Sequence, residues 1–533
     1  MELDRRWRST CRIVLGEEVG ALSDYGKWLS ERADRAFHSK STASGKEVTY
    51  SIDEYCKDSH RISFEEIDFG RKAEPLPIND IKDIDSISNS LAERFSYAGN
   101  LILGNSKCIE KSANVSDSHY VYNSSQIGDS KYIAYASMGR QCDHIFGSSA
   151  PGNSSFLISC IDTYFVQRAF ELWMTANAAD CHYVFAINDC SECMFSFNLR
   201  GKRHCIGNVQ LPKEKYLQIK HSLLLQMREE LEAKKRLPSL SDILAKCSDH
   251  SSEARALLAG KLPAKDAEKG SMEPIEEAFS RTSEILLDTR LSGLQDYKGW
   301  LLKRLRKGER RKSVLSGRDL FVADYAKYLE LPKSRAILDV EAQQLVGLSP
   351  PARNIEGIML ANAHEYIGNI GYIPLKYAVG SNVNMIDCMT YADSLNCLQC
   401  APCVKMKDSA YNWWPRTSEH LFGCGMVFDS AFCVHCYQSV KLQRCFEVDS
   451  SRDCADCFFC HNCENVQNGL FCFNAKNLKY AIGNVEVGRE KFAQAKAALM
   501  RRIVPALEAG KMPGIDIFSI ACASGRKNQP CPK

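Results

Sequence analysis

Paired cysteines are the residues of this chain whose type and spacing most clearly suggest chemistry. The 533-residue sequence has 25 cysteines, and several form C-x-x-C pairs with the spacing of zinc ligands. Two of these pairs begin 21 residues apart, so a backbone that repeats every 21 residues would bring four thiols to one level. The predicted metal site, for Zn²⁺, therefore consists of Cys433, Cys436, Cys454 and Cys457.

Two alternatives to zinc stay open for these cysteines. Cysteine is a small apolar residue that fills tight interiors, and this role needs no metal. Stacked thiols also have the separation that a disulfide requires under oxidising conditions. Inert packing is the leading expectation, so we expect no cofactor, with zinc as the alternative.

Aromatic and basic residues are the candidates for binding a partner. A Trp-Trp pair lies outside the cysteine spacing and is expected to be exposed, where it would suit stacking against sugars or bases. A basic run of seven residues within ten is expected on a helix end, where it would contact nucleic acid or an acidic protein. These candidates are Trp413, Trp414, Lys303, Arg304, Arg306, Lys307, Arg310, Arg311 and Lys312.

Composition and motifs argue against several classes of function. The sequence lacks G-x-S-x-G, H-E-x-x-H, Walker A and G-x-G-x-x-G signatures, so we do not expect an enzyme, although a site split between two units stays open. The formal net charge of +3 neither favours nor excludes nucleic acid. With no apolar run of ~20 residues and no secretory leader, we expect no membrane insertion and a cytoplasmic protein with reduced thiols.

The phase of the cysteines indicates the backbone that must position them. All thirteen cysteines in 382–484 and all six in 112–208 stand at separations that are multiples of three. Other residues in this phase are mostly small or aliphatic, whereas aromatic residues avoid it, with Tyr391 as the exception. One residue in three is therefore expected to face a narrow interior.

A tight β-solenoid explains a period of three best. A simple strand has a period of two and an α-helix one of 3.6, while 3₁₀-helices rarely persist and collagen requires glycine in every triplet. The pattern is similar to that of the beetle antifreeze type of solenoid. Lattice residues of the same type recur every 21 residues in the second segment, which predicts about five rungs for each solenoid.

The chain also repeats itself once. Asp24-Tyr25 recurs as Asp296-Tyr297, and Ile206-Gly207-Asn208-Val209 recurs as Ile482-Gly483-Asn484-Val485, at nearly equal offsets of 272 and 276 positions. Tandem duplication is expected, giving a mainly β protein with flanking helices. The predicted domains are 1–111 (N-terminal mixed α/β part of unit one), 112–208 (first β-solenoid), 209–272 (helix and linker), 273–381 (N-terminal mixed part of unit two), 382–484 (second β-solenoid) and 485–533 (capping amphipathic helix and tail).

The end of the first solenoid resembles a known family. The segment from Cys193 to Tyr216, CMFSFNLRGKRHCIGNVQLPKEKY, resembles uncharacterised cysteine-rich β-solenoid proteins of small-genome bacteria and archaea. In those proteins, triplets with C-x-x-C, Asn and Tyr end in a similar Cys-Ile-x-Asn turn and a charged helix. Members often begin with a zinc ribbon built from C-x-x-C motifs. This chain lacks the ribbon, because Cys11, Cys56 and Cys108 before the first solenoid form no C-x-x-C motif. The resemblance implies the fold and carries no activity.

These features together predict a non-enzymatic structural, scaffold or interaction protein. A rigid repetitive surface suits the docking of protein partners or of a second copy, so the chain is expected to be a subunit of a larger assembly. The alternatives are a metal- or redox-binding protein that uses the stacked cysteines and a nucleic-acid-binding protein that uses the basic helix.

Overall fold

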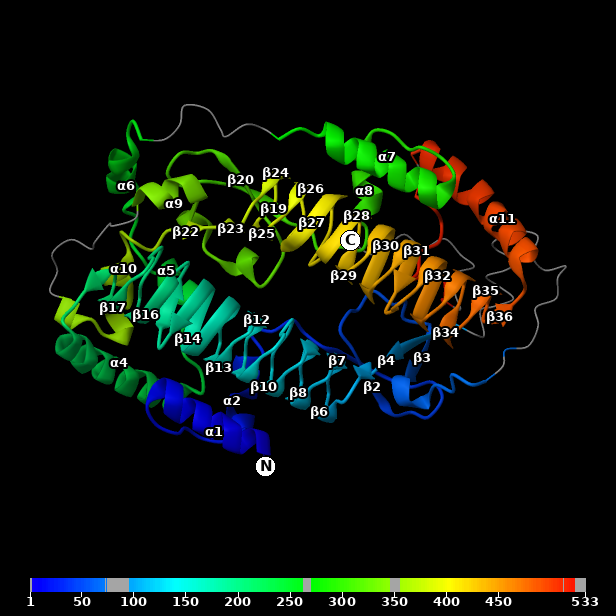
Figure 1. Ribbon diagram of the computed structural model, residues 1–533. Coiled ribbons are helices and arrows are strands. Elements are labelled where there is room, and N and C mark those ends of the chain that lie inside the picture. The colour runs from blue at the N-terminus through cyan, green and yellow to red at the C-terminus, as the bar shows by residue number, and fades with distance from the viewer. Residues whose placement is uncertain are drawn as a thin grey trace.

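The computed structural model describes residues 2–71, 73, 95–261, 270–345, 355–510 and 512–522, and these form a mainly β protein with flanking helices. Most of its strands belong to two large, unclosed sheets that lie side by side (Figure 1). We call the sheet that runs from β6 to β18 sheet one and the sheet that runs from β23 to β36 sheet two. Both are mainly parallel and end in an antiparallel pair, so they are mixed sheets.

Sheet one comprises β6 (Lys107–Glu110), β8 (His119–Tyr122), β10 (Lys131–Ala134), β11 (Asp143–Phe146), β12 (Ser149–Gly152), β13 (Ser155–Ile158), β14 (Ile161–Ala179), β15 (His182–Phe185), β16 (Asn188–Met194), β17 (Arg203–Ile206) and β18 (Val209–Gln210). Three short strands beside it pair with one another: β5 (Ile102–Leu103), β7 (Ala113–Ser116) and β9 (Ser125–Gly128).

Sheet two comprises β23 (Tyr377–Val379), β24 (Val383–Ile386), β25 (Thr390–Ala392), β26 (Leu395–Leu398), β27 (Cys403–Ala410), β28 (Arg416–Phe422), β29 (Gly425–Phe428), β30 (Ala431–Val440), β31 (Gln443–Asp449), β32 (Ala455–Glu464), β33 (Gln467–Leu470), β34 (Phe473–Lys476), β35 (Lys479–Ile482) and β36 (Val485–Glu486). The two large sheets thus begin before residues 112 and 382, the predicted starts of the repetitive segments.

Strands of both sheets pair in parallel with the segment twelve residues later in the chain. Cys433 lies opposite Cys445, for example. Residues in the left-handed region recur at every third position, as at Phe432, His435 and Gln438, with φ of 55°, 52° and 47°. Each such residue turns the chain after a short extended stretch, and Asn and Asp are frequent there because they tolerate this region best. The repeat of 21 residues expected from the sequence is wrong, because strands pair at a step of twelve residues. Each repetitive segment therefore contains more steps than the five rungs predicted.

Residues in the cysteine phase are buried against one another, as the period of three predicts. One buried cluster in sheet two contains all thirteen of its cysteines together with residues such as Leu421 and Val448. A corresponding cluster in sheet one contains six cysteines among aliphatic residues such as Val121 and Leu157. Both clusters consist of residues of that one phase.

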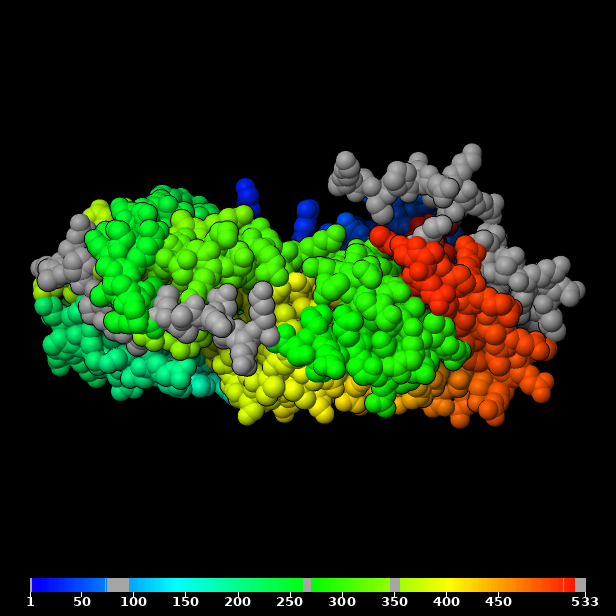
Figure 2. Space-filling model, turned by 90° about the horizontal axis from the view of Figure 1, so that it is seen from above, coloured from blue at the N-terminus to red at the C-terminus, as the bar shows by residue number. Residues whose placement is uncertain are grey.

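Helices flank the outer sides of the two sheets. Figure 1 shows α1 and α4 along sheet one and α7 and α11 along sheet two, and Figure 2 shows α7 and α11 covering sheet two from above. The helices are α1 (Glu2–Leu15), α2 (Leu22–Leu29), α4 (Lys213–Lys234), α5 (Leu240–Ala245), α6 (Ser251–Leu258), α7 (Glu273–Leu287), α8 (Lys298–Leu301), α9 (Asp339–Leu345), α10 (Ala363–Ile367) and α11 (Arg489–Glu508). Helices α5 and α6 lie in the stretch 209–272, of which part was expected to be a linker.

Smaller strand pairs recur at the spacing of the sequence repeat. The hairpin of β1 (Phe37–Lys40) and β2 (Glu47–Tyr50) has its equivalent in unit two in the hairpin of β19 (Glu309–Lys312) and β20 (Asp319–Val322). Two further parallel pairs are formed by β3 (His60–Ser63) with β4 (Ser96–Gly99) and by β21 (Ala336–Ile337) with β22 (Ile373–Pro374). Parts of the predicted domains 1–111, 209–272, 273–381 and 485–533 lie outside the described residues.

A segment at the end of the N-terminal part of each unit contacts the large sheet of the other unit, whereas α1 and α7 pack against the sheet of their own unit. Asn474 of sheet two donates its side-chain N–H to the carbonyl of Ser96 at 2.9 Å, and Asn198 of sheet one donates to the carbonyl of Tyr372 at 2.9 Å. Both residues of the second bond stand 276 positions from those of the first. The segments around Ser96 and Tyr372 therefore contact the opposite units in the same way.

A further ion pair joins equivalent positions of the two units. The Arg306 guanidinium contacts the Asp34 carboxylate at 2.8 Å, and these residues stand 272 positions apart. A contact between a residue and its own equivalent is what a two-fold relation produces at its axis. The interface between the units therefore behaves like that of a symmetric dimer within one chain.

Candidate binding cleft between the two units

The four cysteines predicted to bind zinc do not lie at one level. Cys433 pairs with Cys445 on the next strand, and Cys457 lies one strand further on, opposite Gly469. The stacking that motivated the metal site rested on the longer repeat and is wrong for that reason. Among the described residues there is no group of three or more His, Cys, Asp or Glu side chains that could hold a metal ion.

These thiols are instead engaged with the backbone around them. Cys436 donates to the carbonyl of Cys445 at 3.5 Å, and Cys454 donates to that of Cys463 at 3.6 Å. Burial raises the pKa of Cys433 and of Cys436 well above the ordinary thiol value. Protonated thiols that donate hydrogen bonds are suited to packing.

The tryptophan pair that was expected to be exposed is buried. Trp413 is 6% exposed and donates its indole N–H to the carbonyl of Asp324 at 2.9 Å, while the Arg306 guanidinium lies 4.4 Å from its ring centre. Trp414 is 7% exposed and packs edge-on against Phe428. The expectation of exposure is wrong, for Trp413 because residues distant in the chain cover its ring and for Trp414 because the neighbouring strand does.

The basic run 303–312 is neither a helix end nor a free cationic surface. It crosses a turn into strand β19, and acidic residues distant in the chain neutralise much of it. Lys303 and Arg304 both contact Asp516 at 2.8 Å, and although burial opposes this, the two cations lower the pKa of Asp516 to about 2. Arg310 pairs with Asp387, and Arg311 is buried with its guanidinium donating to backbone carbonyls. Lys307 and Lys312 remain exposed.

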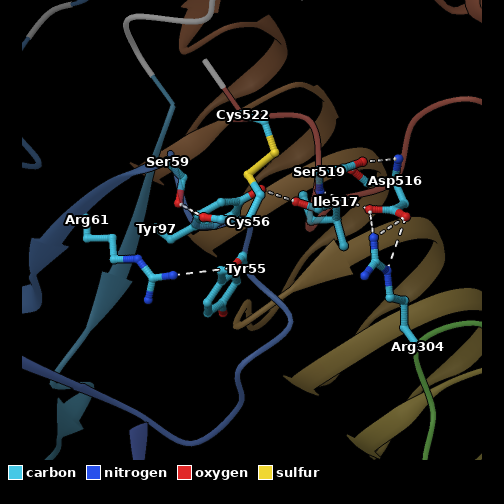
Figure 3. The surroundings of a disulfide bond; sticks show 10 residues. All are labelled: Tyr55, Cys56, Ser59, Arg61, Tyr97, Arg304, Asp516, Ile517, Ser519 and Cys522. Atoms are coloured by element: carbon cyan, nitrogen blue, oxygen red, sulfur yellow. Dashed lines mark hydrogen bonds and ion pairs between the residues drawn. A yellow bond between two sulfur atoms is a disulfide. The ribbon is translucent and has the colours of Figure 1, made fainter. Parts of the chain in front are cut away.

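A disulfide holds the end of the described chain against the N-terminal part of unit one. Cys56 and Cys522 are bonded, next to the contact of Asp516 with Arg304 (Figure 3). The other described cysteines are free thiols. The disulfide is an exception to the expectation that most thiols are free, and it lies outside the cysteine phase that fills the sheets.

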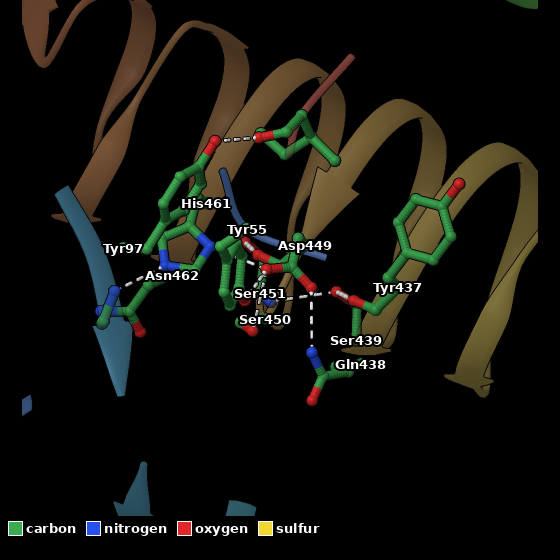
Figure 4. A network of polar contacts seen from close by, with 12 residues as sticks. Tyr55, Tyr97, Tyr437, Gln438, Ser439, Asp449, Ser450, Ser451, His461 and Asn462 are labelled. Atoms are coloured by element: carbon green, nitrogen blue, oxygen red, sulfur yellow. Dashed lines mark hydrogen bonds and ion pairs between the residues drawn. The ribbon is translucent and has the colours of Figure 1, made fainter. Parts of the chain in front are cut away.

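A buried polar network holds the same N-terminal part on sheet two. The Asp449 carboxylate accepts the Tyr55 hydroxyl at 2.5 Å and His461 Nδ1–H at 2.8 Å (Figure 4). His461 Nε2 in turn accepts the backbone N–H of Ala98 at 2.9 Å, which fixes the neutral tautomer of the ring. Because these groups satisfy one another, the network is suited to holding the two parts together.

One space available for a ligand lies between sheet two and the unit-one strands β5, β7 and β9, which stand beside sheet one. A cavity of about 300 Å³ is lined by both of these walls, within the range of small-molecule sites. The wall from sheet two is a row of residues that pair successively at the twelve-residue step: Arg416, Phe428, Val440, Arg452, Glu464 and Lys476. The facing wall from the unit-one strands includes the corresponding row Ser116, Gly128 and Arg140.

Three residues of the cavity lining each carry a buried polar atom that has no hydrogen-bond partner in the described structure. These atoms are the indole N–H of Trp414, the Nε–H of Arg416 and the side-chain oxygen of Gln126. Buried polar atoms are nearly always paired, because leaving one unpaired costs about 1–3 kcal/mol. Their convergence on one cavity marks it as the candidate binding site.

Sequence reasoning missed most of this site. Trp414 was singled out, but as an exposed residue, while Arg416 and Gln126 were not considered. The signal that identifies the row is the spacing of twelve, at which Arg416, Phe428 and Val440 follow one another. The assumption of a longer repeat concealed it.

No family model, curated protein or solved structure matches the chain. None of the helices in the described ranges combines the length and the apolar character needed to cross a membrane.

Proposed function

We propose that this chain is a non-enzymatic binding scaffold in which two β-solenoids form the walls of a ligand-binding cleft. On this proposal each large sheet is a solenoid whose twelve-residue turn has four sides of three residues. The parallel step of twelve supports it, as do the left-handed residue in every triplet and the buried clusters of a single phase.

The reciprocal packing of the two units would keep the walls of the cleft at a fixed separation. The N-terminal part of each unit is bonded to the opposite sheet, and the ion pair between Asp34 and Arg306 joins the units near their axis. A preorganised cleft loses little conformational entropy when it binds, which favours affinity. This arrangement supports a scaffold that presents a preformed site to a partner within a larger assembly.

The observation that carries the proposal is the group of unpartnered polar atoms in the cavity. Trp414 and Arg416 offer donors and Gln126 offers an acceptor to the same space. A bound ligand would pair these atoms, and Phe428 and Met426 would supply apolar contact area.

Native mass spectrometry of the protein purified from its own host tests this proposal. We expect a bound component that is lost in a Gly128→Trp variant, whose side chain would enter the cavity. A Cβ added at Gly128 comes no closer than 3.4 Å to its neighbours, so the change is sterically tolerable near the backbone. The matched control is Lys131→Trp, at an exposed position that begins β10. A bare monomer mass in the wild type, or retention of the component by Gly128→Trp, would contradict the proposal.

A further inference from the structure

The charges that line the cleft are mostly neutralised within the protein. Glu464 contacts Arg452 at 2.6 Å and Lys476 at 2.8 Å, and Arg140 lies 3.5 Å from Asp129. These pairs cancel most of the local charge, and their members are in part exposed to water. They therefore give the cavity little preference for a charged ligand.

Arg416 differs from the other charged residues of the lining. It is half-buried, and it makes no hydrogen bond or ion pair with any described residue. One counter-charge that interacts with Arg416 is the buried carboxyl of Asp162, which accepts the Tyr328 hydroxyl at 2.8 Å. Burial raises the pKa of Asp162 to about 6, although Tyr328 and Arg416 act to lower it. Asp162 thus leaves the Nε–H edge of Arg416 unpaired.

The surroundings of Arg416 combine donors with an apolar surface. The indole N–H of Trp414 is a second unpaired donor on the same stretch of chain, and the Arg416 guanidinium lies 5.7 Å from the Trp414 ring centre. Phe428 pairs with Arg416 in the adjacent strand and packs against Trp414. Two donors of this kind, one of them cationic, beside two aromatic rings match a ligand with an anionic group and an apolar body.

We infer that the cleft binds an anionic small molecule with an apolar, preferably aromatic, body, whose charged group pairs with Arg416 and Trp414. The inference rests on the proposed binding function and adds the chemical class of the ligand. Gln126 Oε1, the unpaired acceptor of the cavity, takes a donor elsewhere on the same molecule.

A pair of dyes that differ mainly in charge tests the inference. 8-Anilinonaphthalene-1-sulfonate is an anion with an aromatic body, and N-phenyl-1-naphthylamine is its neutral counterpart. We expect the anionic dye to bind the wild-type full chain at least about tenfold more tightly than the neutral dye, as measured by fluorescence titration in phosphate-free buffer. Gly128→Trp should weaken both dyes, which places them in the cleft.

Substitutions of the two donors assign the charge preference to them. Arg416→Gln should weaken the anionic dye by about tenfold or more and leave the neutral dye within about twofold. Arg444→Gln is the matched control, because Arg444 belongs to the same sheet, is already paired with Asp456 at 2.7 Å and does not line the cavity. Trp414→Phe, which keeps an aromatic ring and removes the N–H, provides a second test should Arg416→Gln fail to fold.

The outcomes separate the two proposals. If both dyes bind in the cleft with equal affinity, and Arg416→Gln and Trp414→Phe change neither affinity, the proposed cleft is supported. The inference that its ligand is anionic is then wrong. If neither dye binds the wild type, or Gly128→Trp leaves both unchanged, the cleft itself is wrong as a binding site.

Discussion

The interiors of the two large sheets differ in composition at equivalent positions. Aliphatic residues of sheet one correspond, 276 positions later, to cysteines of sheet two, and both sets are buried. A thiol thus occupies the place of a methyl-bearing side chain, which supports packing as its role. The corresponding pairs are Leu157 with Cys433, Ala178 with Cys454, Val184 with Cys460 and Ile187 with Cys463.

A second difference concerns hydrogen bonds to the backbone. Ser148 of sheet one accepts the N–H of Cys160 at 3.0 Å, whereas its equivalent Cys424 accepts the N–H of Cys436 at 3.4 Å through sulfur. Hydroxyl oxygen is the stronger acceptor, so this backbone N–H is held by a better hydrogen bond in sheet one. The same backbone therefore tolerates two ways of satisfying an interior N–H, and substitutions can reveal how far they are interchangeable.

Acid should destabilise the protein at one position of sheet one where the equivalent residue of sheet two does not titrate. His182 is buried with its Nε2 2.8 Å from the carbonyl of Val14, and its equivalent in sheet two is Phe458. Burial and Lys220 lower the pKa of His182 from 6.5 to about 3. Below pH 6.5 the folded state then binds fewer protons than the unfolded state. The contribution of His182 to the free energy of unfolding is therefore complete only above pH 6.5. It falls by about 1.4 kcal/mol per pH unit as the pH drops toward 3.

Urea unfolding from about pH 7 to about pH 4 measures this slope. His182→Phe, which copies sheet two, should flatten the acid limb, and His221→Phe at an exposed position on α4 should leave it unchanged. An equally steep limb in His182→Phe would show that other groups determine the acid sensitivity.

The disulfide should stabilise the unit-two half, where the unit-one half has no covalent link among the described residues. The position equivalent to Cys56 is Tyr328, whose hydroxyl bonds to Asp162, and Cys247 at the end of the corresponding segment is a free thiol. Cys522→Ser should lower the free energy of unfolding by about 2–4 kcal/mol. Cys247→Ser should change it by less than about 1 kcal/mol.

Denaturant unfolding with hydrogen exchange of residues 512–522 tests this difference. The wild type treated with reductant should match Cys522→Ser, and exchange in that segment should rise in both. Equal losses of unfolding free energy in Cys522→Ser and Cys247→Ser would contradict the predicted difference between the two halves.

The hydrogen-bond difference predicts unequal costs for the same truncation. Ser148→Ala leaves the buried N–H of Cys160 without its acceptor and should cost about 1–3 kcal/mol. Cys424→Ala removes a weaker sulfur acceptor and should cost less, while Cys424→Ser should be within about 1 kcal/mol of the wild type. Thermal unfolding of the three variants, with Ser148→Cys as the reciprocal control, measures the comparison; a larger cost for Cys424→Ala would reverse it.

The sequence was sufficient to predict which residues face the interior. It was insufficient to predict how many residues separate paired positions on neighbouring strands. A period of three is visible because the interior excludes large side chains at every third residue, whichever strands pair. Any pairing step that is a multiple of three preserves that phase. Only the observed strand pairing, such as that of Cys433 in β30 with Cys445 in β31, shows that the step is twelve residues. The cleft depends on that step, and the burial of Trp413 and the neutralisation of Arg304 depend on Asp324 and Asp516, which only the fold brings near.

The smallest expected effect is the one that best separates packing from metal binding. Cys454→Ala places in sheet two the residue that sheet one has at Ala178, and it removes one buried sulfur. If Cys454 only packs, Cys454→Ala should lower the free energy of unfolding by about 1 kcal/mol or less. The zinc content of anaerobically purified protein should then be the same in the variant and the wild type. Ala178→Cys is the reciprocal control and should bind no additional zinc. Stoichiometric zinc in the wild type that is lost in Cys454→Ala, together with a large fall in Tm, would instead make these thiols ligands and break the equivalence of the two interiors.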